Sequence, residues 1–90
     1  MKIQKIVIHS QGAPDVMVME SAELDAPGPG EAQIQHTAIG LNYMDVYQRS
    51  GAYPLMLPSP LGLEAAGRVI AVGEGVSEVA VGDRVVYGGV

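Results

Sequence analysis

The chain has 90 residues, of which 48% are apolar and 17% are charged, and ten acidic side chains against five Lys and Arg give a net charge of −5. This composition excludes a disordered chain, and no apolar run is long enough for a transmembrane helix. The five bases are scattered along the sequence. Because phosphate binding needs clustered Lys and Arg, neither nucleic acid nor a membrane is expected as a partner.

The N-terminal residues predict two strands separated by a turn. Apolar and polar residues alternate in "KIQKIVIH", turn formers crowd "QGAPD", and "VMVMES" has the composition of a second strand. The start lacks a long apolar segment and a small-residue cleavage site, so we interpret it as a strand rather than a signal peptide. A cytoplasmic location is the resulting expectation.

The next segment predicts a loop and a third strand. "ELDAPGPGEA" carries two Pro and two Gly in succession, which excludes a helix or a central strand. "AQIQHTAIGL" alternates again and should place Ile34 and Ile39 in apolar environments. These two residues have opposite parity, so a β-bulge is expected between them.

A short helix is predicted after the third strand. Asn42 can cap it, Asp45 falls at the third helical position, and Gly51 suits the left-handed residue that ends a helix. The helix would be about two turns long.

The last third of the chain predicts an extended segment and two strands. "YPLMLPSPLG" is rich in Pro, and "GRVIAVGEGVSEVAVGDRVVYGG" holds two Val-rich strands joined by Gly-containing turns. "GEGVSE" is not a dinucleotide-binding fingerprint, because it lacks the third Gly and no helix follows it. Short strands with Gly and Pro turns indicate a mainly β barrel or sandwich. The chain stops at Val90 directly after a strand, as if cut from a longer protein.

The glycine spacing, which by itself fits turns and bulges, resembles the medium-chain dehydrogenase/reductase superfamily. In its zinc alcohol dehydrogenases, Gly-His-Glu is followed by a Gly three residues on and another Gly six residues later. Those places hold Gly62, Glu64, Gly67 and Gly73 here, with Leu63 in place of the histidine. The resemblance covers almost all of the chain. It implies a GroES-like, partly open β-barrel with one or two short helices.

Both positions that resemble zinc-ligand positions of that superfamily hold residues that cannot bind zinc. The pattern Gly-x-Cys-x-x-Asp reads "GLNYMD" from Gly40 to Asp45, so Asn42 replaces the cysteine. The chain has no cysteine at all, which also excludes disulfides. A catalytic zinc needs three protein ligands, so no metal is expected. We interpret His9 and His36 as surface or hydrogen-bonded residues rather than ligands.

Among the zinc-free branches, "GLNYMDVYQRSG" and "YPLMLPSPLGLEAAG" most closely resemble the NADPH:quinone oxidoreductases of the zeta-crystallin type. The resemblance implies a two-domain enzyme. Residues 1–90, a GroES-like domain truncated at its C-terminal end, would form the substrate-side wall of a cleft. A Rossmann domain absent from this chain would form the other wall and bind most of the NADPH. The fragment alone would be inactive, and a homodimer of the longer enzyme stays open.

The resemblance also assigns roles to residues of the predicted helix and the segment after it. Asn42, Tyr47 and Tyr53 resemble the groups that position nicotinamide and quinone, and they are the expected catalytic residues. The expected contacts to the cofactor are Asn42, Tyr43, Met44, Asp45, Val46 and Tyr47.

Several of these residues also have an interpretation without chemistry. Asn42 can cap the helix, a role compatible with binding a carbonyl. Tyr43 and Tyr47 lie four apart on one helix face and can either pack in the core or stack on a flat ring. Asp45 can be a structural carboxylate at the helix start, and Glu64 can orient the loop or bind a backbone amide.

The loss of zinc ligands favours one class of reaction. Hydride transfer to a quinone or another conjugated carbonyl places negative charge on an oxygen, and neutral hydrogen-bond donors can stabilise it there. Alcohol oxidation would gain more from a metal. Two alternatives stay open: a zinc-free enone or enoyl reductase, and a non-catalytic GroES-like binding module. A co-chaperonin would need a long mobile loop where this chain has the predicted helix and the Pro-rich segment.

Overall fold

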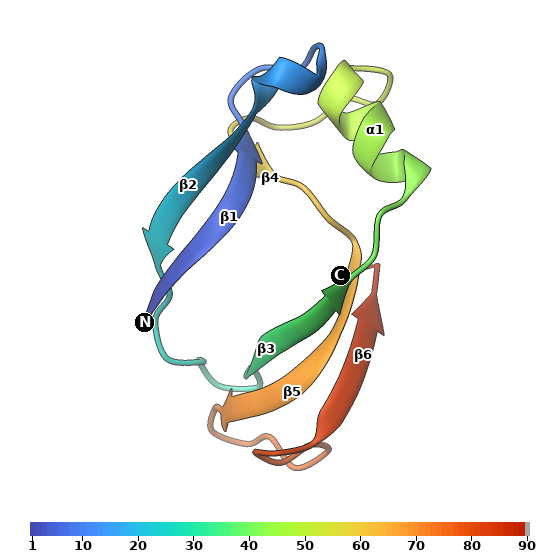
Figure 1. Ribbon diagram of the computed structural model, residues 1–90. Coiled ribbons are helices and arrows are strands. Elements are labelled where there is room, and N and C mark those ends of the chain that lie inside the picture. Colours follow the sequence, from blue (N-terminus) through green and yellow to red (C-terminus); the bar gives the residue numbers. More distant parts are fainter. Residues whose placement is uncertain (90) are drawn as a thin grey trace. The chain divides into compact units, whose positions relative to one another are not determined.

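The chain is mainly β, as predicted, and the computed structural model describes residues 1–89 (Figure 1). Every helix in this part of the chain is too short to cross a bilayer. Along the chain the elements are β1 (Lys2–Ile8), the 3-10 helix η1 (Pro14–Val16), β2 (Met17–Glu23), β3 (Ala32–Ile39), α1 (Tyr43–Ser50), β4 (Ser59–Pro60), β5 (Glu64–Val72) and β6 (Arg84–Gly88).

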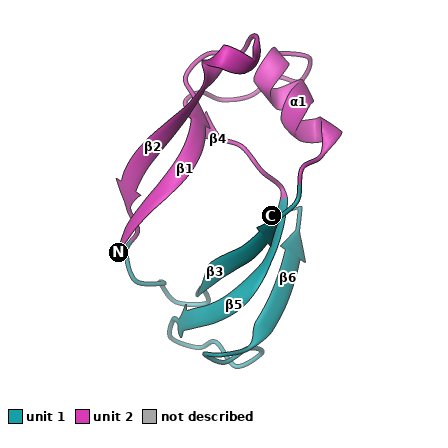
Figure 2. Cartoon of the chain, viewed as in Figure 1, with its two compact units in different colours: residues 1, 25–40, 64–90 teal, residues 2–24, 41–63 magenta. Residues whose placement is uncertain are grey.

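The chain divides into two compact units, each with its own three-stranded antiparallel sheet (Figure 2). The α1 unit consists of Lys2–Leu24 and Leu41–Leu63, and the β5 unit of Met1, Asp25–Gly40 and the chain from Glu64 onward. No strand ladder joins the two sheets within the described residues, which agrees with the partly open barrel predicted from the sequence.

The α1 unit is organised around β1. Its sheet has the order β2-β1-β4, so β1 has a neighbour on both sides where it passes β4. The residues at that point, Val7 and Ile8, pair with Pro60 and Ser59 and are buried, Ile8 completely. Burial therefore concentrates where the strand is flanked on both edges.

The β5 unit has the sheet order β3-β5-β6, with β5 in the centre. Ala65, Gly67 and Val69 alternate along β5 and are all buried, as expected for one face of a central strand. The register between β3 and β5 shifts after Gln33 and again after His36, which confirms the predicted irregularity. Ile39 contradicts the sequence prediction, because its side chain is 69% exposed. It ends an edge strand, where no further strand can cover it.

Gly67 lies in the middle of β5 rather than in a turn. A Cβ atom there would come within 2.2 Å of the Gln35 carbonyl oxygen and 2.7 Å of Ile34 Cγ2. Both contacts are to β3, so the missing side chain lets the two strands approach at the bulge.

We therefore predict that Gly67→Ala destabilises the protein by about 1–3 kcal/mol, because the added methyl group must push the β3 backbone away. Urea denaturation followed by circular dichroism measures this change. Gly88→Ala in the neighbouring β6 is the matched control, because its Cβ would make only an ordinary 3.8 Å contact with Glu64 Cβ. Equal unfolding midpoints for the two variants would contradict the close approach.

Candidate functional site

The candidate site starts at the N-terminal end of α1, where the helix begins as predicted. Asp45 Oδ2 accepts a hydrogen bond from the Asn42 backbone N–H at 3.0 Å. The Asp45 N–H donates to the Asn42 backbone carbonyl, also at 3.0 Å, and the Asn42 side chain faces the same amide as in a capping box. The Asp45 carboxylate therefore has the predicted structural role at the helix start, where negative charge is favourable.

Two side-chain atoms at this end are buried without a hydrogen-bond partner among the described residues. They are Asn42 Nδ2, a donor, and Asp45 Oδ1, an acceptor, and Asp45 as a whole is only 6% exposed. Leaving a buried polar group unsatisfied costs about 1–3 kcal/mol. Asn42 Nδ2 is thus a donor whose hydrogen-bonding capacity is unused within residues 1–89.

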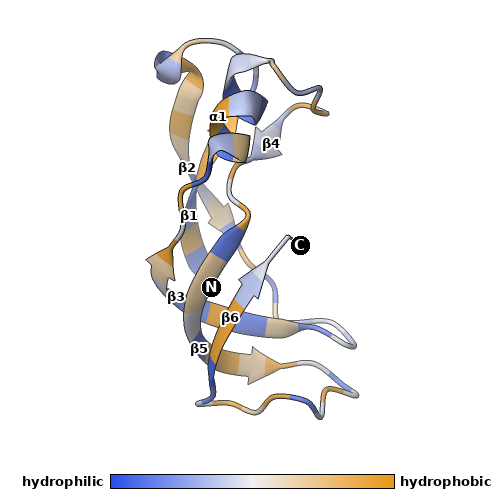
Figure 3. Ribbon diagram, turned by 90° about the vertical axis from the view of Figure 1, so that its right-hand side faces the viewer, coloured by the Kyte–Doolittle hydropathy of each residue, from blue (hydrophilic) through white to orange (hydrophobic). Residues whose placement is uncertain are grey.

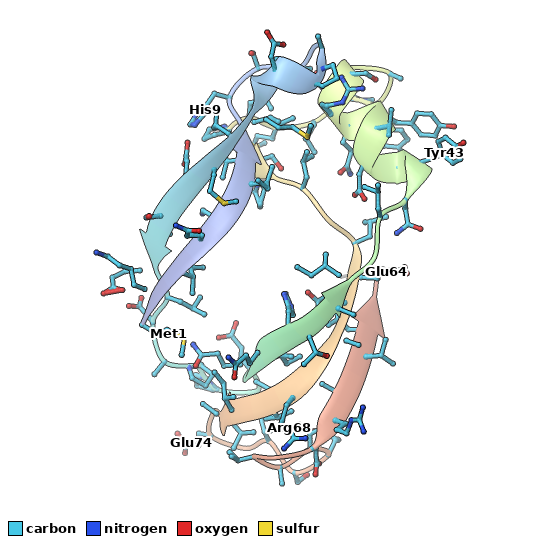
Figure 4. All side chains as sticks on the ribbon, viewed as in Figure 1. Met1, His9, Tyr43, Glu64, Arg68 and Glu74 are labelled. Atoms are coloured by element: carbon cyan, nitrogen blue, oxygen red, sulfur yellow. The ribbon has the colours of Figure 1, made fainter. Side chains whose placement is uncertain are left out.

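Tyr43 and Tyr47 lie on one face of α1, as their spacing predicts, and their rings stack on each other. The ring centroids are 6.4 Å apart and the planes are inclined by 24°. Tyr43 extends away from the helix and is 79% exposed, and Tyr47 is 45% exposed (Figure 4). Among the described residues the pair does not pack into a core, so its ring surface is free to contact another molecule or domain.

The two other predicted contact residues also belong to α1, which carries both hydrophobic and hydrophilic residues (Figure 3). Met44 is half-buried, whereas Val46 is 38% exposed. Leu63, at the second position that resembles a zinc-ligand position, is half-buried and directly precedes β5.

The C-terminal end of α1 ties Tyr53 to the helix. Gly51 adopts the left-handed conformation that the sequence predicts, with φ 97° and ψ 1°, and its N–H donates to the Tyr47 carbonyl at 3.2 Å. The Tyr53 N–H donates to the same carbonyl at 3.1 Å. Tyr47 and Tyr53 are therefore held next to each other through the backbone, and the Tyr53 side chain is 50% exposed.

Three residues that the sequence does not single out hold this end of α1. Gln11 Nε2 donates to the Gln48 carbonyl at 2.9 Å and to the Tyr53 carbonyl at 2.8 Å. The Gly12 N–H donates to the Arg49 carbonyl at 2.7 Å, and the Arg49 guanidinium donates back to the Gly12 carbonyl. The sequence predicts a turn at Gln11 and Gly12, but turn composition says nothing about which helix the turn contacts.

Glu64 acts on the start of the loop through its backbone. Its carbonyl accepts a hydrogen bond from the Gly40 N–H at 3.1 Å. Its carboxylate lies against the same residue, since a Cβ atom at Gly40 would come within 2.2 Å of Glu64 Oε1. These contacts with Gly40 agree with the interpretation that Glu64 orients the start of the loop that leads to α1.

Both histidines are hydrogen-bonded to side chains, in line with their predicted structural role. His9 contacts the Glu20 carboxylate, and His36 Nε2 lies 3.0 Å from the Tyr87 hydroxyl, with ring centroids 5.8 Å apart. Within residues 1–89, no group of three His, Asp or Glu side chains is close enough together to hold a metal ion.

The sequence pattern of the alcohol dehydrogenase GroES-like domain matches residues 28–89, which is more than half of the chain. The chain belongs to this family. The GroES-like fold implied by the resemblance to the medium-chain dehydrogenase/reductase superfamily is therefore confirmed.

Relatives of this GroES-like domain include two reductases. Quinone oxidoreductase 1 of Escherichia coli is 46% identical over 84 residues, covering 92% of this chain and 26% of that protein. The 2-haloacrylate reductase of a Burkholderia species is 42% identical over 87 residues, again covering 92% of this chain and 26% of that protein. The predicted resemblance to quinone oxidoreductases is confirmed.

A solved structure, that of Escherichia coli quinone oxidoreductase complexed with NADPH, superposes on this domain with a TM-score of 0.92. The two chains are 44% identical, and the match covers 97% of this chain and 27% of that one. The GroES-like domain described here thus spans about a quarter of the length of the proteins it matches.

The turn after α1 leads to a prediction. We expect Gly51→Ala to destabilise the protein by about 1–2 kcal/mol, because a Cβ atom is strained in the left-handed conformation. Gly51→Asn is the matched control, since Asn tolerates this conformation better than other non-glycine residues, and it should recover much of the loss. Urea denaturation of the three proteins measures the difference. An alanine variant as stable as the parent would show that the helix does not end through this conformation.

Proposed function

We propose that this domain forms the substrate-side wall of the active site in a longer, NADPH-dependent quinone oxidoreductase, with a Rossmann domain as the other wall. The observation that carries the proposal is the unpartnered, buried donor Asn42 Nδ2, beside exposed tyrosines on the same helix. The similarity to an Escherichia coli quinone oxidoreductase complexed with NADPH supports both the substrate class and the cofactor.

The residues of α1 fit the nicotinamide end of such a cofactor. Asn42 Nδ2 is a donor in need of an acceptor, and the side chains from Tyr43 to Tyr47 include ring surface that this chain leaves uncovered. The phosphate groups of the cofactor have no cluster of Lys and Arg to bind here, because the five bases of this chain are scattered. The second domain would hold them. When bound, NADPH supplies the hydride; this domain contributes contacts.

In this proposal the protein groups act by hydrogen bonding and by shape. Asn42 donates to the substrate carbonyl oxygen, where negative charge develops, and its position is set in advance by the helix start. Tyr47 and Tyr53 present ring faces to a flat quinone, and their hydroxyl groups donate to its oxygens. A donor in place from the start stabilises the developing charge without having to reorganise.

The first test replaces Asn42 by Ser in the longer gene product. Serine keeps a capping oxygen at the helix start but lacks the amide donor. We expect kcat with 1,4-benzoquinone to fall by roughly 100-fold, the lower end of the loss for one preorganised donor. The urea unfolding midpoint should not fall, because the substitution removes a buried donor that has no partner within residues 1–89, and this serves as the control. A serine variant with the turnover of the parent would show that Asn42 is only a helix cap.

The second test concerns the metal. The reaction should be zinc-independent, because Asn42 and Leu63 occupy the positions that resemble zinc-ligand positions and neither side chain is a zinc ligand. Dialysis of the longer gene product against a chelator should leave quinone turnover unchanged, and elemental analysis should find no stoichiometric zinc. One zinc per chain, with activity lost on chelation, would contradict the proposal.

A second candidate function is reduction of a conjugated alkene. The 42% identity with a 2-haloacrylate reductase favours it, and a neutral donor at Asn42 can stabilise an enolate oxygen as well as a quinone oxygen. Parallel assays of the same protein with 1,4-benzoquinone, an alkenal and a 2-haloacrylate would separate the two.

Inactivity of the isolated 90-residue chain and a cytoplasmic location remain predictions, and a homodimer of the longer enzyme stays open.

A further inference from the structure

Tyr53 lies outside every helix and strand, yet both polar groups of its backbone are held. Its N–H donates to the Tyr47 carbonyl at 3.1 Å, and its carbonyl accepts a hydrogen bond from Gln11 Nε2 at 2.8 Å. A loop residue normally keeps much of its conformational freedom, and ordering it costs free energy. Here the exposed tyrosine ring projects from a backbone that is anchored on both sides.

Gln11 makes this anchor by bridging the turn that leads from α1 to Tyr53. The same Nε2 also donates to the Gln48 carbonyl at 2.9 Å. Both acceptors are carbonyl oxygens, so the amide must present its NH₂ group to them, and the two N–H bonds serve one acceptor each. The side chain also lies over Gly51, where a Cβ atom would be 3.5 Å from Gln11 Cβ.

The backbone next to Gln11 is fixed as well. Gly12 and Arg49 exchange hydrogen bonds, through the Gly12 N–H to the Arg49 carbonyl and through the Arg49 guanidinium to the Gly12 carbonyl. Gln11 therefore projects from a segment already tied to the end of α1. The carbonyls of Gln48 and Arg49 are among those that the end of a helix leaves without intrahelical partners.

We propose that Gln11 is a positioning residue that holds Tyr53 in place for substrate binding. It does not touch the substrate; it acts through the Tyr53 backbone. The role of Tyr53 rests on the proposed function, whereas the hold of Gln11 on Tyr53 rests on the hydrogen bonds. Fixing the ring before the substrate arrives removes an ordering cost from binding.

The first arm of the test measures Tyr53 without activity. The longer gene product is labelled with 3-fluorotyrosine, and the resonances that disappear in Tyr53→Phe and in Tyr87→Phe are assigned to these two residues. Gln11→Glu keeps the size of the side chain but removes both donors and places a carboxylate against two carbonyl oxygens. We expect the Tyr53 resonance to narrow and move towards the value of free fluorotyrosine, while the Tyr87 resonance stays unchanged. A Tyr53 resonance unaffected by Gln11→Glu overturns the inference whatever the activity.

The second arm measures kcat/KM with 1,4-benzoquinone in the longer gene product. Gln11→Glu should lower it about tenfold, since two hydrogen bonds of ordinary net strength are lost. Gln11→Lys, which keeps a donor of similar reach, should retain most of it. Gln4→Glu is the matched control, because it makes the same charge change at an exposed position of β1 and should have no effect.

The third arm combines Gln11→Glu with Tyr53→Ala. If Gln11 acts through Tyr53, adding Gln11→Glu to the Tyr53→Ala protein lowers kcat/KM no further. The inference is overturned if Gln11→Glu lowers kcat/KM equally in the parent and in the Tyr53→Ala protein. It is also overturned if the Gln11→Glu protein is as active as the Gln4→Glu protein. If Tyr53→Ala alone keeps full turnover, the proposed role of Tyr53 fails instead, and the fluorine spectra then decide separately whether Gln11 holds it.

Discussion

Helix α1 has eight residues, too few for a stable helix by itself, so it depends on hydrogen bonds to its two ends. Asp45 Oδ2 accepts from the Asn42 backbone N–H at the first end. At the other end Gln11 and Gly12 donate to carbonyls of the last turn. The proposed active-site residues lie on this helix, directly before it or shortly after it. Whatever loosens the ends of α1 also displaces the groups that would meet the substrate.

The same helix carries groups that this chain leaves incomplete. Buried polar atoms in proteins almost always have a partner, yet Asn42 Nδ2 and Asp45 Oδ1 have none within residues 1–89. Next to Asn42 in sequence, Leu41 is 85% exposed and Tyr43 79%. One unpaired donor, one unpaired acceptor and uncovered apolar side chains fit a surface that another domain and a ligand complete. This agrees with a chain that spans about a quarter of its relatives.

Sequence reasoning worked best where the signal is local. Alternation and turn residues predicted the strands, and Asn42, Asp45 and Gly51 predicted both ends of α1, because caps act within a few residues of the helix terminus. It failed at Ile39, for which the alternating pattern predicted an apolar environment but whose side chain is exposed at the end of an edge strand. Periodicity describes the faces of a strand, and it does not describe what lies beyond its end.

The sequence by itself determined the order of the elements, because alternation, turns and helix caps are properties of neighbouring residues. Its resemblance to the superfamily placed Asn42 and Leu63 at the two positions that resemble zinc-ligand positions. Only the tertiary structure decided that Asn42 Nδ2 is left without a partner within residues 1–89 and that Gln11 anchors Tyr53. Gln11 is 37 and 42 residues from its two acceptors. Such bonds depend on the path of the whole chain, and no local pattern of residue types encodes that path.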